Sequence, residues 1–362
     1  MLFFKSNGRM IFPKKLSANY FGLRYKQTPN ISNKHEVTLV TNSIYDKRNT
    51  NSIIEIFNAA KCPIHFDVIN QFSFDSFSDR KALRKNQAIL LCNPERKGEY
   101  SVPNSPYYKY LGLYIKVIHN YNMQNVQTKY KNVDFVIIRH NLEGEDSGIE
   151  YQPIPDVYQT IRVLTKKETY KIAKEAFEYV SKNNRKKITC VHNFKAMPLS
   201  NKLFVDTCNE VAQDYPNIEF SSMNIHRATV QLINNPKQFD SILLTNMYGL
   251  LYAAIAAGLA GGDSMSAGAN YGPEYMLFEA GTRYNRQYFD LGVKFNPTAI
   301  IMAGANMLKS MGLSNYGTLI DDSVKNVYKK GERLPFDVGG RANVKEFTKE
   351  VTDEIERNLS NY

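Results

Sequence analysis

The sequence predicts an α/β fold in two domains, and three features of its 362 residues support that class. Short apolar segments alternate with longer helical patterns, as expected of a mainly parallel sheet covered by helices. The length suffices for two hydrophobic cores. The hydrophobic fraction of 43% is that of a globular protein rather than a disordered one.

The predicted strands are short runs rich in Val, Ile, Leu and Phe. In chain order they cover residues 37–40, 66–69, 88–92, 133–138, 188–192, 218–222 and 241–245. The predicted helices show apolar residues at helical spacing. They cover residues 51–61, 167–183, 201–215, 228–234, 247–260, 297–311, 319–330 and 344–358. Gly261 and Gly262 follow one of these helices, as glycine commonly does at a helix C-terminus.

A β-arm is predicted between the strand at 133–138 and the helix at 167–183. Pro153 and Pro155 oppose a helix here, and apolar residues alternate with polar ones over 157–164. Alternation of period two favours extended strands rather than another helix–strand unit.

The net charge of +11 comes mostly from the N-terminal end. Residues 1–35 hold seven Lys and Arg and no acid, so 39 of the 46 Lys and Arg remain to balance 35 Asp and Glu. A nearly neutral globular part gives no electrostatic footprint for nucleic acid, so no nucleic-acid partner is expected. The basic N-terminal extension, 1–35, is typical of a mitochondrial targeting segment, with a disordered basic tail as the alternative.

Cysteine spacing argues against a disulfide framework and a zinc site, and hydropathy argues against a membrane-spanning helix. Cys62, Cys92, Cys190 and Cys208 form no C-x-x-C pair, which indicates reduced thiols rather than a disulfide framework or a zinc site. The longest apolar run, 247–260, is shorter than the ~20 residues that a membrane helix needs. It is predicted to be a buried helix, and no transmembrane segment is expected.

The segment 133–148, VDFVIIRHNLEGEDSG, resembles the strand and substrate loop of the isocitrate/isopropylmalate dehydrogenase family. The resemblance extends over about 36–359 and implies the family's fold, with two α/β domains. It implies a large domain made of 36–100 plus 271–362, and a small domain, 101–270, whose β-arm clasps a neighbouring subunit. A homodimer, or a heterodimer with a related subunit, is therefore expected.

The substrate loop of the family carries an Arg, an acid and a Tyr that meet a 2-hydroxy acid. In this sequence Arg139 remains, while His140 stands at the acid and Asp146 at the Tyr. One Arg cannot supply the several fixed cations that a tricarboxylate needs.

A second substrate element of the family supplies an Asn and two Arg. The resemblance places Asn104 at the Asn, and Tyr108 and Ile118 at the two Arg. Asn104 and Arg139 are thus the residual substrate-site positions that the resemblance leaves.

The catalytic and metal positions of the family are altered as well. Asn193 stands at the catalytic Lys, and Lys195, two positions on, is a weaker candidate to replace it. Three Asp of the family bind Mg²⁺ or Mn²⁺, and their positions hold His226, Leu250 and Ala254. A hard cation needs oxygen ligands, so neither a metal site nor a catalytic residue is expected. His226 alone is better interpreted as structural.

The predicted cofactor loop lacks the His-Gly pair that meets the nicotinamide dinucleotide in the family. The segment 278–284, FEAGTRY, looks more like the loop of the non-catalytic subunit of mitochondrial NAD-dependent isocitrate dehydrogenase. No cofactor is expected, but Arg283, Asn296 and Asp337 remain candidates to hold an adenine nucleotide or NAD. The alternatives are an exposed Arg, a helix-capping Asn and a turn Asp.

Two functions follow from the resemblance, and both are non-catalytic. In the family the Lys and one metal-binding Asp are lent to the neighbour's active site, where Asn193 and His226 would be unsuited. This favours an accessory subunit of a larger mitochondrial assembly in the matrix or at the matrix face of the inner membrane, such as a membrane-bound energy-transducing complex. The alternative is a regulatory subunit of a hetero-oligomeric NAD-dependent isocitrate dehydrogenase of the tricarboxylic acid cycle.

Overall fold

The computed structural model describes residues 34–41, 44–70, 72–92, 105–145, 147–281 and 296–359, with the backbone alone described at 44–49 and 105. Most of the basic N-terminal extension, residues 1–33, lies outside this part of the chain. Among the described residues no helix is long and apolar enough to cross a membrane.

Ten strands form one sheet, and two more form a separate hairpin. The strands of the sheet are β1 (His35–Thr41), β2 (Ile64–Asn70), β3 (Ala88–Cys92), β4 (Ile115–Tyr121), β5 (Asp134–His140), β8 (Lys187–His192), β9 (Glu219–Asn224), β10 (Ser241–Leu244), β11 (Ala267–Tyr271) and β12 (Met276–Ala280). Their order across the sheet is β2-β1-β3-β12-β11-β4-β5-β10-β8-β9. Strands from both predicted domains therefore share one sheet, and the division into 36–100 plus 271–362 and 101–270 stays a prediction.

The sheet is parallel at both ends and antiparallel in the middle. Strands β2, β1, β3 and β12 run parallel, as do β5, β10, β8 and β9. Strand β11 is antiparallel to both β12 and β4, and β4 is antiparallel to β5. The predicted strands do not include β4, β11 or β12, because polar residues such as Lys116, Asn120 and Asn270 interrupt their apolar patterns.

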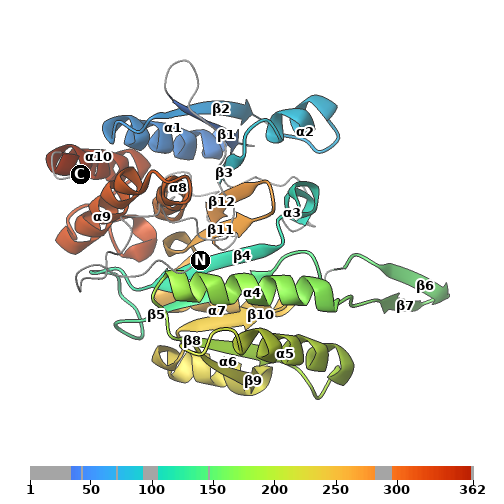
Figure 1. The fold of residues 1–362 in the computed structure, drawn as a ribbon. Coiled ribbons are helices and arrows are strands. Elements are labelled where there is room, and N and C mark those ends of the chain that lie inside the picture. The colour runs from blue at the N-terminus through green and yellow to red at the C-terminus, as the bar shows by residue number, and fades with distance from the viewer. Residues whose placement is uncertain are drawn as a thin grey trace, which may run out of the picture.

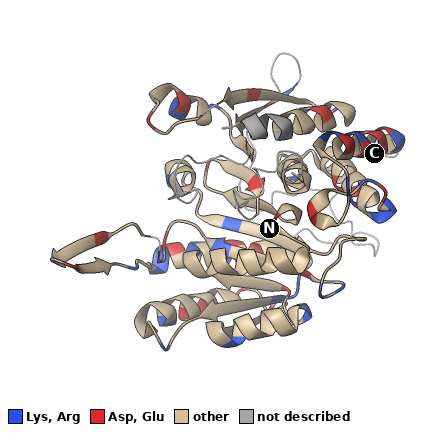
Figure 2. Cartoon of the chain, turned by 180° about the vertical axis from the view of Figure 1, so that it is seen from behind, with Lys and Arg blue, Asp and Glu red and all other residues tan. Residues whose placement is uncertain are grey.

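The helices cover the two ends of the sheet separately (Figure 1). At the end of β1–β3 lie α1 (Ile44–Ala59), α2 (Phe77–Leu83), α3 (Ser105–Leu111), α8 (Thr298–Ser310), α9 (Ser314–Lys330) and α10 (Val344–Asn358). At the end of β8–β10 lie α4 (Lys166–Lys182), α5 (Pro198–Ala212), α6 (Ile225–Asn234) and α7 (Asn246–Ala260). Lys and Arg are interspersed with Asp and Glu along several of these helices (Figure 2).

Four predicted helices begin at least three residues earlier than their apolar periodicity indicates, among them α5, which starts at Pro198 instead of 201. Helices α1, α6 and α9 start at Ile44, Ile225 and Ser314 instead of 51, 228 and 319. The first turn of α6 is polar, but Asn224 caps it by accepting a hydrogen bond from the backbone N of His226. The C-terminal glycine prediction for α7 is confirmed, since Gly261 is its C-cap with φ of 118°.

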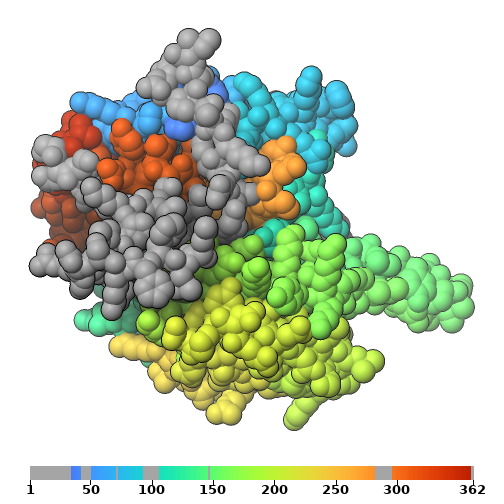
Figure 3. Space-filling model, in the orientation of Figure 1, coloured from blue at the N-terminus to red at the C-terminus, as the bar shows by residue number. Residues whose placement is uncertain are grey.

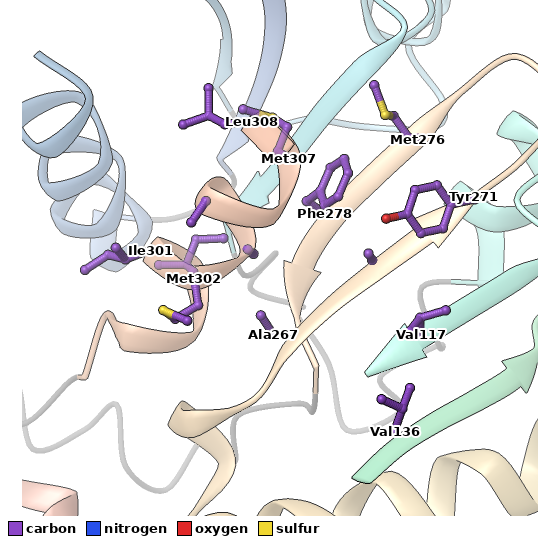
Figure 4. Close-up of a cluster of buried hydrophobic side chains, with 14 of the residues drawn as sticks. Val117, Val136, Ala267, Tyr271, Met276, Phe278, Ile301, Met302, Met307 and Leu308 are labelled. Carbon is purple, nitrogen blue, oxygen red and sulfur yellow. The ribbon is translucent and has the colours of Figure 1, made fainter. Parts of the chain in front are cut away.

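Alternate side chains of the central strands enter different hydrophobic cores. On one face a single core extends along the sheet and packs against α1, α4, α8, α9 and α10. Figure 4 shows part of this core, with Val117, Tyr271 and Phe278 from the sheet and Met302 from α8. On the other face there are two smaller cores, one beneath α6 and α7 and one near α2 and α3. The space between these two cores holds the polar residues described below.

The hairpin formed by β6 (Glu150–Ile154) and β7 (Val157–Thr160) projects away from the rest of the molecule (Figures 1 and 3). This confirms the predicted β-arm. Asp156 turns the chain between the two strands with φ of 64°. At the base of the arm, Gly144 and Val163 form an antiparallel bridge.

Candidate functional site

A buried polar strip lies on the sheet face that carries two separate cores. It consists of Lys116, Arg139, Asn141, Asn270 and Glu279, from β4, β5, β11, β12 and the loop after β5. In register, Lys116 pairs with both Arg139 and Asn270, so these three side chains point to the same face. The strip thus lies between the core under α6 and α7 and the core near α2 and α3.

Glu279 is the anionic centre of the buried polar strip. Its Oε1 accepts hydrogen bonds from Lys116 Nζ at 2.8 Å, Tyr108 Oη at 2.6 Å and Asn270 Nδ2 at 2.9 Å. Burial alone would raise the pKa of Glu279, but the charge of Lys116 and these hydrogen bonds hold that pKa below its ordinary value. The carboxylate is therefore ionised and already paired.

Arg139 is connected to Glu279 through two amide side chains. Its Nε and Nη2 donate to Asn141 Oδ1 at 3.3 and 3.2 Å, and Asn141 Nδ2 donates to Asn270 Oδ1 at 3.0 Å. The side chain is 6% exposed. It lies directly against Gly249 of α7, where a Cβ atom would come within 2.4 Å of Arg139 Cγ. Arg139, predicted as a residual substrate-site position, is thus fixed by hydrogen bonds to Asn141 and by packing against Gly249.

His140 organises the turn after β5. Its Nδ1 accepts hydrogen bonds from the backbone N of Leu142 at 3.1 Å and of Glu143 at 3.0 Å. Burial, followed by the charges of Lys171 and Arg139, lowers the pKa of His140 to about 4. The ring is therefore neutral near pH 7, with its proton on Nε2, for which the described residues offer no acceptor. A neutral ring cannot supply the charge of the acid that the family has here.

The residue predicted to stand at the family's catalytic Lys is a hydrogen-bonded amide. Asn193 Nδ2 donates to Tyr248 Oη at 3.1 Å, and the backbone N of Asn193 donates to Asn201 Oδ1 at 2.9 Å. An amide does not transfer a proton at neutral pH, so Asn193 cannot act as a general acid. Lys195 is exposed, and whether it replaces the missing Lys stays a prediction.

The three positions expected to lack metal ligands lie on α6 and α7. His226 is exposed in the first turn of α6, Leu250 is half-buried, and Ala254 is exposed on α7. None of the three has an oxygen ligand, so they do not fit Mg²⁺ or Mn²⁺. A separate group of Glu36, His65 and Asp67 brings ligand atoms within 4.8 Å of one another on β1 and β2.

The side chains of that group already have partners. His65 Nδ1 lies 2.7 Å from Glu36 Oε2, and Lys85 Nζ donates to Asp67 Oδ2 at 2.8 Å. The group lies near one edge of the sheet, whereas Arg139 lies in its middle.

Two of the three candidate nucleotide-binding residues lie together. Asn296 Nδ2 donates to Asp337 Oδ1 at 3.1 Å and to Asp337 Oδ2 at 3.2 Å. Asn296 Oδ1 accepts from the backbone N of Thr298, the first residue of α8, at 2.9 Å. The bond from Thr298 satisfies the backbone N–H at the start of α8, although the N-cap residue of that helix is Pro297. Arg283, like the substrate-site position Asn104 and the loop residue Asp146, lies outside the described residues.

Most of the buried polar strip and one further ion pair were not predicted from the sequence. Arg162 Nε lies 2.9 Å from Glu145 Oε1, with both side chains largely buried, and joins the base of the arm to the loop after β5. Arg162 also donates to Ser200 Oγ of α5 at 2.6 Å. The sequence offered one sign that Lys116 is buried, namely its position as the only charged residue within the apolar run 115–118.

Comparisons with known proteins identify a family and relatives that match nearly the whole chain. Residues 35–355 match the family described as isocitrate/isopropylmalate dehydrogenase. The chain is 33% identical over 335 residues to isocitrate dehydrogenase [NAD] subunit 1, mitochondrial, of Schizosaccharomyces pombe, which covers 89% of this chain and 94% of that protein. It is 33% identical to isocitrate dehydrogenase [NAD] regulatory subunit 1, mitochondrial, of Arabidopsis thaliana, over 91% of this chain and 91% of that protein.

A solved structure also matches nearly the full length. The crystal structure of isocitrate dehydrogenase from Methylococcus capsulatus superposes with a TM-score of 0.84 at 26% sequence identity. The match covers 89% of this chain and 99% of that one.

Proposed function

The chain belongs to the isocitrate/isopropylmalate dehydrogenase family, and we propose that it is a non-catalytic, regulatory-type subunit of a mitochondrial NAD-dependent isocitrate dehydrogenase. The relatives described above are mitochondrial subunits, and one of them is named regulatory. This similarity supports the regulatory alternative better than the accessory role that the sequence alone favours.

One observation carries the proposal: the positions of the catalytic Lys and of the metal ligands hold side chains unable to replace them. Asn193 is bonded to Tyr248, and Leu250 and Ala254 offer no oxygen ligand. A bound divalent cation would polarise the 2-hydroxyl group of the substrate, which contributes several kcal/mol to catalysis. Loss of both the cation and the general acid would lower the rate by roughly 10⁵ or more.

The remaining polar residues support structure rather than a dinucleotide site. The side-chain nitrogen of Asn296 donates to Asp337 and to Tyr328 Oη, so its two N–H groups already have partners other than a ribose or phosphate group. Arg139 uses two of its nitrogens for Asn141. We therefore expect no catalytic cofactor, and binding of an adenine nucleotide at Arg283, Asn296 and Asp337 is the weaker proposal.

Association with a related subunit would use the arm and the outer faces of α6 and α7. On the arm, Ile154 is 61% and Tyr158 is 67% exposed. On α6 and α7, Val230 and Leu251 are each 54% exposed. Large apolar side chains grouped on a surface indicate a protein interface, because their exposure to water is unfavourable. A homodimer or heterodimer formed through these segments is part of the proposal.

A second candidate is an accessory subunit of a larger mitochondrial assembly. It is favoured by Asn193 and His226, which stand where the family lends a Lys and an Asp to a neighbouring active site. A regulatory subunit must leave the active site of its catalytic partner intact. The two candidates therefore differ in whether a catalytic dehydrogenase subunit pairs with this chain.

Reconstitution tests the regulatory proposal. The full chain is mixed with the catalytic NAD-dependent isocitrate dehydrogenase subunit of the same organism, and the mass of the complex and its rate of isocitrate oxidation are measured. The proposal expects a mixed oligomer whose KM for isocitrate differs from that of the catalytic subunit alone. A Leu251→Glu variant is the matched control, since it should assemble less and shift KM less. No mixed oligomer, or an unchanged KM in a mixed oligomer, would argue against a regulatory role.

A further inference from the structure

A polar pocket lies on the sheet face opposite to the buried polar strip. In β4, Lys116 faces the strip, so Val117, His119 and Tyr121 point to the other side. There a pocket of about 230 Å³ lies over β4 and β11, between α4 and the helices α8 and α9. Val117, Ala267 and Met302, which belong to its apolar lining, are labelled in Figure 4.

The residues that line the pocket include two Lys and one Asp, while Asp134 and Asp322 also act on Tyr121. Lys309 Nζ of α8 and Lys325 Nζ of α9 both donate to Asp321 Oδ2, at 2.6 and 3.2 Å. Burial alone would raise the pKa of Asp321, but the charges of Lys309 and Lys325 hold that pKa below its ordinary value. One ionised carboxylate therefore balances two ammonium groups, which leaves one positive charge uncompensated within this cluster.

Two buried polar atoms of the pocket residues lack partners. Tyr121 Oη and Asp321 Oδ1 are inaccessible to solvent and make no hydrogen bond with any described residue. Burial, followed by the charge of Asp321, raises the pKa of Tyr121 well above its ordinary value, so its hydroxyl remains a donor. A buried polar group without a partner costs about 1–3 kcal/mol, and both atoms are closed to solvent, so they do not contact an occupant of the pocket.

We propose that this pocket binds a small carboxylate, with its oxyanion between the ammonium groups of Lys309 and Lys325. Charge-assisted hydrogen bonds from two ammonium groups are the chemistry that recognises such an oxyanion. The volume suits only a small molecule, because drug-sized ligands occupy about 300–1,000 Å³. The apolar side chains Met302, Ala267 and Tyr271 would contact its carbon chain.

The bound carboxylate would connect the two ends of the sheet. Tyr179 and Asn183, in and after α4, line one side of the pocket, and residues of α8 and α9 line the other. The site is separate from Arg139, which lies on the opposite face. The inference therefore stands whether or not the chain is a regulatory subunit.

Calorimetric titration of the full chain tests this site with acetate, succinate and inorganic phosphate at constant ionic strength. We expect saturable binding of acetate or succinate that weakens about tenfold in Lys325→Met, since a charge-assisted hydrogen bond is lost. In Asp321→Asn we expect tighter binding, because the internal anion no longer competes for the two Lys. Lys329→Met is the matched control and should bind like the wild type, since Lys329 is exposed near the end of the same helix.

The opposite changes in the two variants separate binding here from a structural effect. Lys325→Met should fold, because Asp321 keeps its hydrogen bond from Lys309, and thermal unfolding verifies this before titration. Absence of saturable carboxylate binding, or equal affinity in wild type and Lys325→Met, would overturn the proposal. Phosphate binding with the same variant pattern but without carboxylate binding would overturn the assignment of a carboxylate.

Discussion

Asn193 Nδ2 donates a hydrogen bond of 3.1 Å to Tyr248 Oη and so joins the end of β8 to the first turn of α7. The same α7 carries Leu250 and Ala254, at two positions where the resemblance places metal ligands. The predicted positions of the general acid and of two metal ligands thus lie on segments joined by a hydrogen bond. Under the proposed function, restoring catalysis would require several changes at once.

The first prediction is that the isolated chain does not reduce NAD or NADP. With isocitrate or 3-isopropylmalate and Mg²⁺ or Mn²⁺, the absorbance of the reduced cofactor should stay at the level of buffer. Asn193→Lys alone should not restore activity, because Leu250 and Ala254 still supply no metal ligand. A rate proportional to protein concentration that disappears in Arg139→Ala would contradict this prediction.

The second prediction concerns the close packing of Gly249 against Arg139. Gly249→Ala should lower the free energy of unfolding by about 1–3 kcal/mol, because the new Cβ would lie 2.4 Å from Arg139 Cγ and force a shift. Gly258→Ala is the control on the same helix, since no atom lies within 4 Å of its added Cβ. The control should be neutral or up to about 1 kcal/mol more stable through helix propensity. Equal effects in urea denaturation would show that the packing contact is unimportant.

The third prediction is a pH dependence of stability due to His140. Its pKa is lowered from 6.5 to about 4 in the folded chain, so between these values the unfolded chain binds more protons. The contribution of neutral His140 is fully present above pH 6.5 and is lost as pH falls toward 4. By linkage this loss is on the order of 3 kcal/mol.

The variant His140→Gln tests this dependence because an amide oxygen can accept the two backbone hydrogen bonds without titrating. Its free energy of unfolding should fall less between pH 6.5 and 4 than that of the wild type. Burial also lowers the pKa of His192, so part of the dependence should remain in the variant. Identical slopes in the two proteins would rule out His140 as the source.

The fourth prediction is that the arm and α7 mediate pairing. Tyr158→Lys and Leu251→Glu should each shift the chain toward monomer at micromolar concentration, because each places a charge in the proposed apolar interface. Phe77→Glu is the control, since Phe77 is 74% exposed on α2, outside these segments. Light scattering measures the mass. A stable wild-type monomer, both alone and with a related subunit, would contradict the proposed interface.

The sequence predicted the parallel ends of the sheet and the arm, but not the antiparallel centre. Several strands of the parallel regions contain short buried apolar runs, as in β3 and residues 242–244 of β10, and these runs identify them. Strand β4 contains Lys116, whose charge is compensated by Glu279, a residue far away in the sequence. Sequence pattern cannot show such pairing, because the partner of a buried charge depends on the tertiary fold.

The candidate site shows the same division between local and tertiary information. The replaced positions Asn193, Leu250 and Ala254 follow from the family resemblance alone. The hydrogen bond from Asn193 to Tyr248 depends on how β8 and α7 lie in space. The connection of Arg139 to Glu279 through two amides depends in the same way on β5, β11 and β12. The substrate-site prediction for Asn104 and the nucleotide prediction for Arg283 lie outside the described residues and stay predictions.

Purification of the chain from mitochondria at its natural abundance, with identification and quantification of its partners, tests the central claim most directly. We expect catalytic subunits of NAD-dependent isocitrate dehydrogenase to be recovered with it in a fixed, near-stoichiometric ratio. Recovery with subunits of a membrane-bound complex, and without any catalytic isocitrate dehydrogenase subunit, would contradict the regulatory role and favour the accessory one.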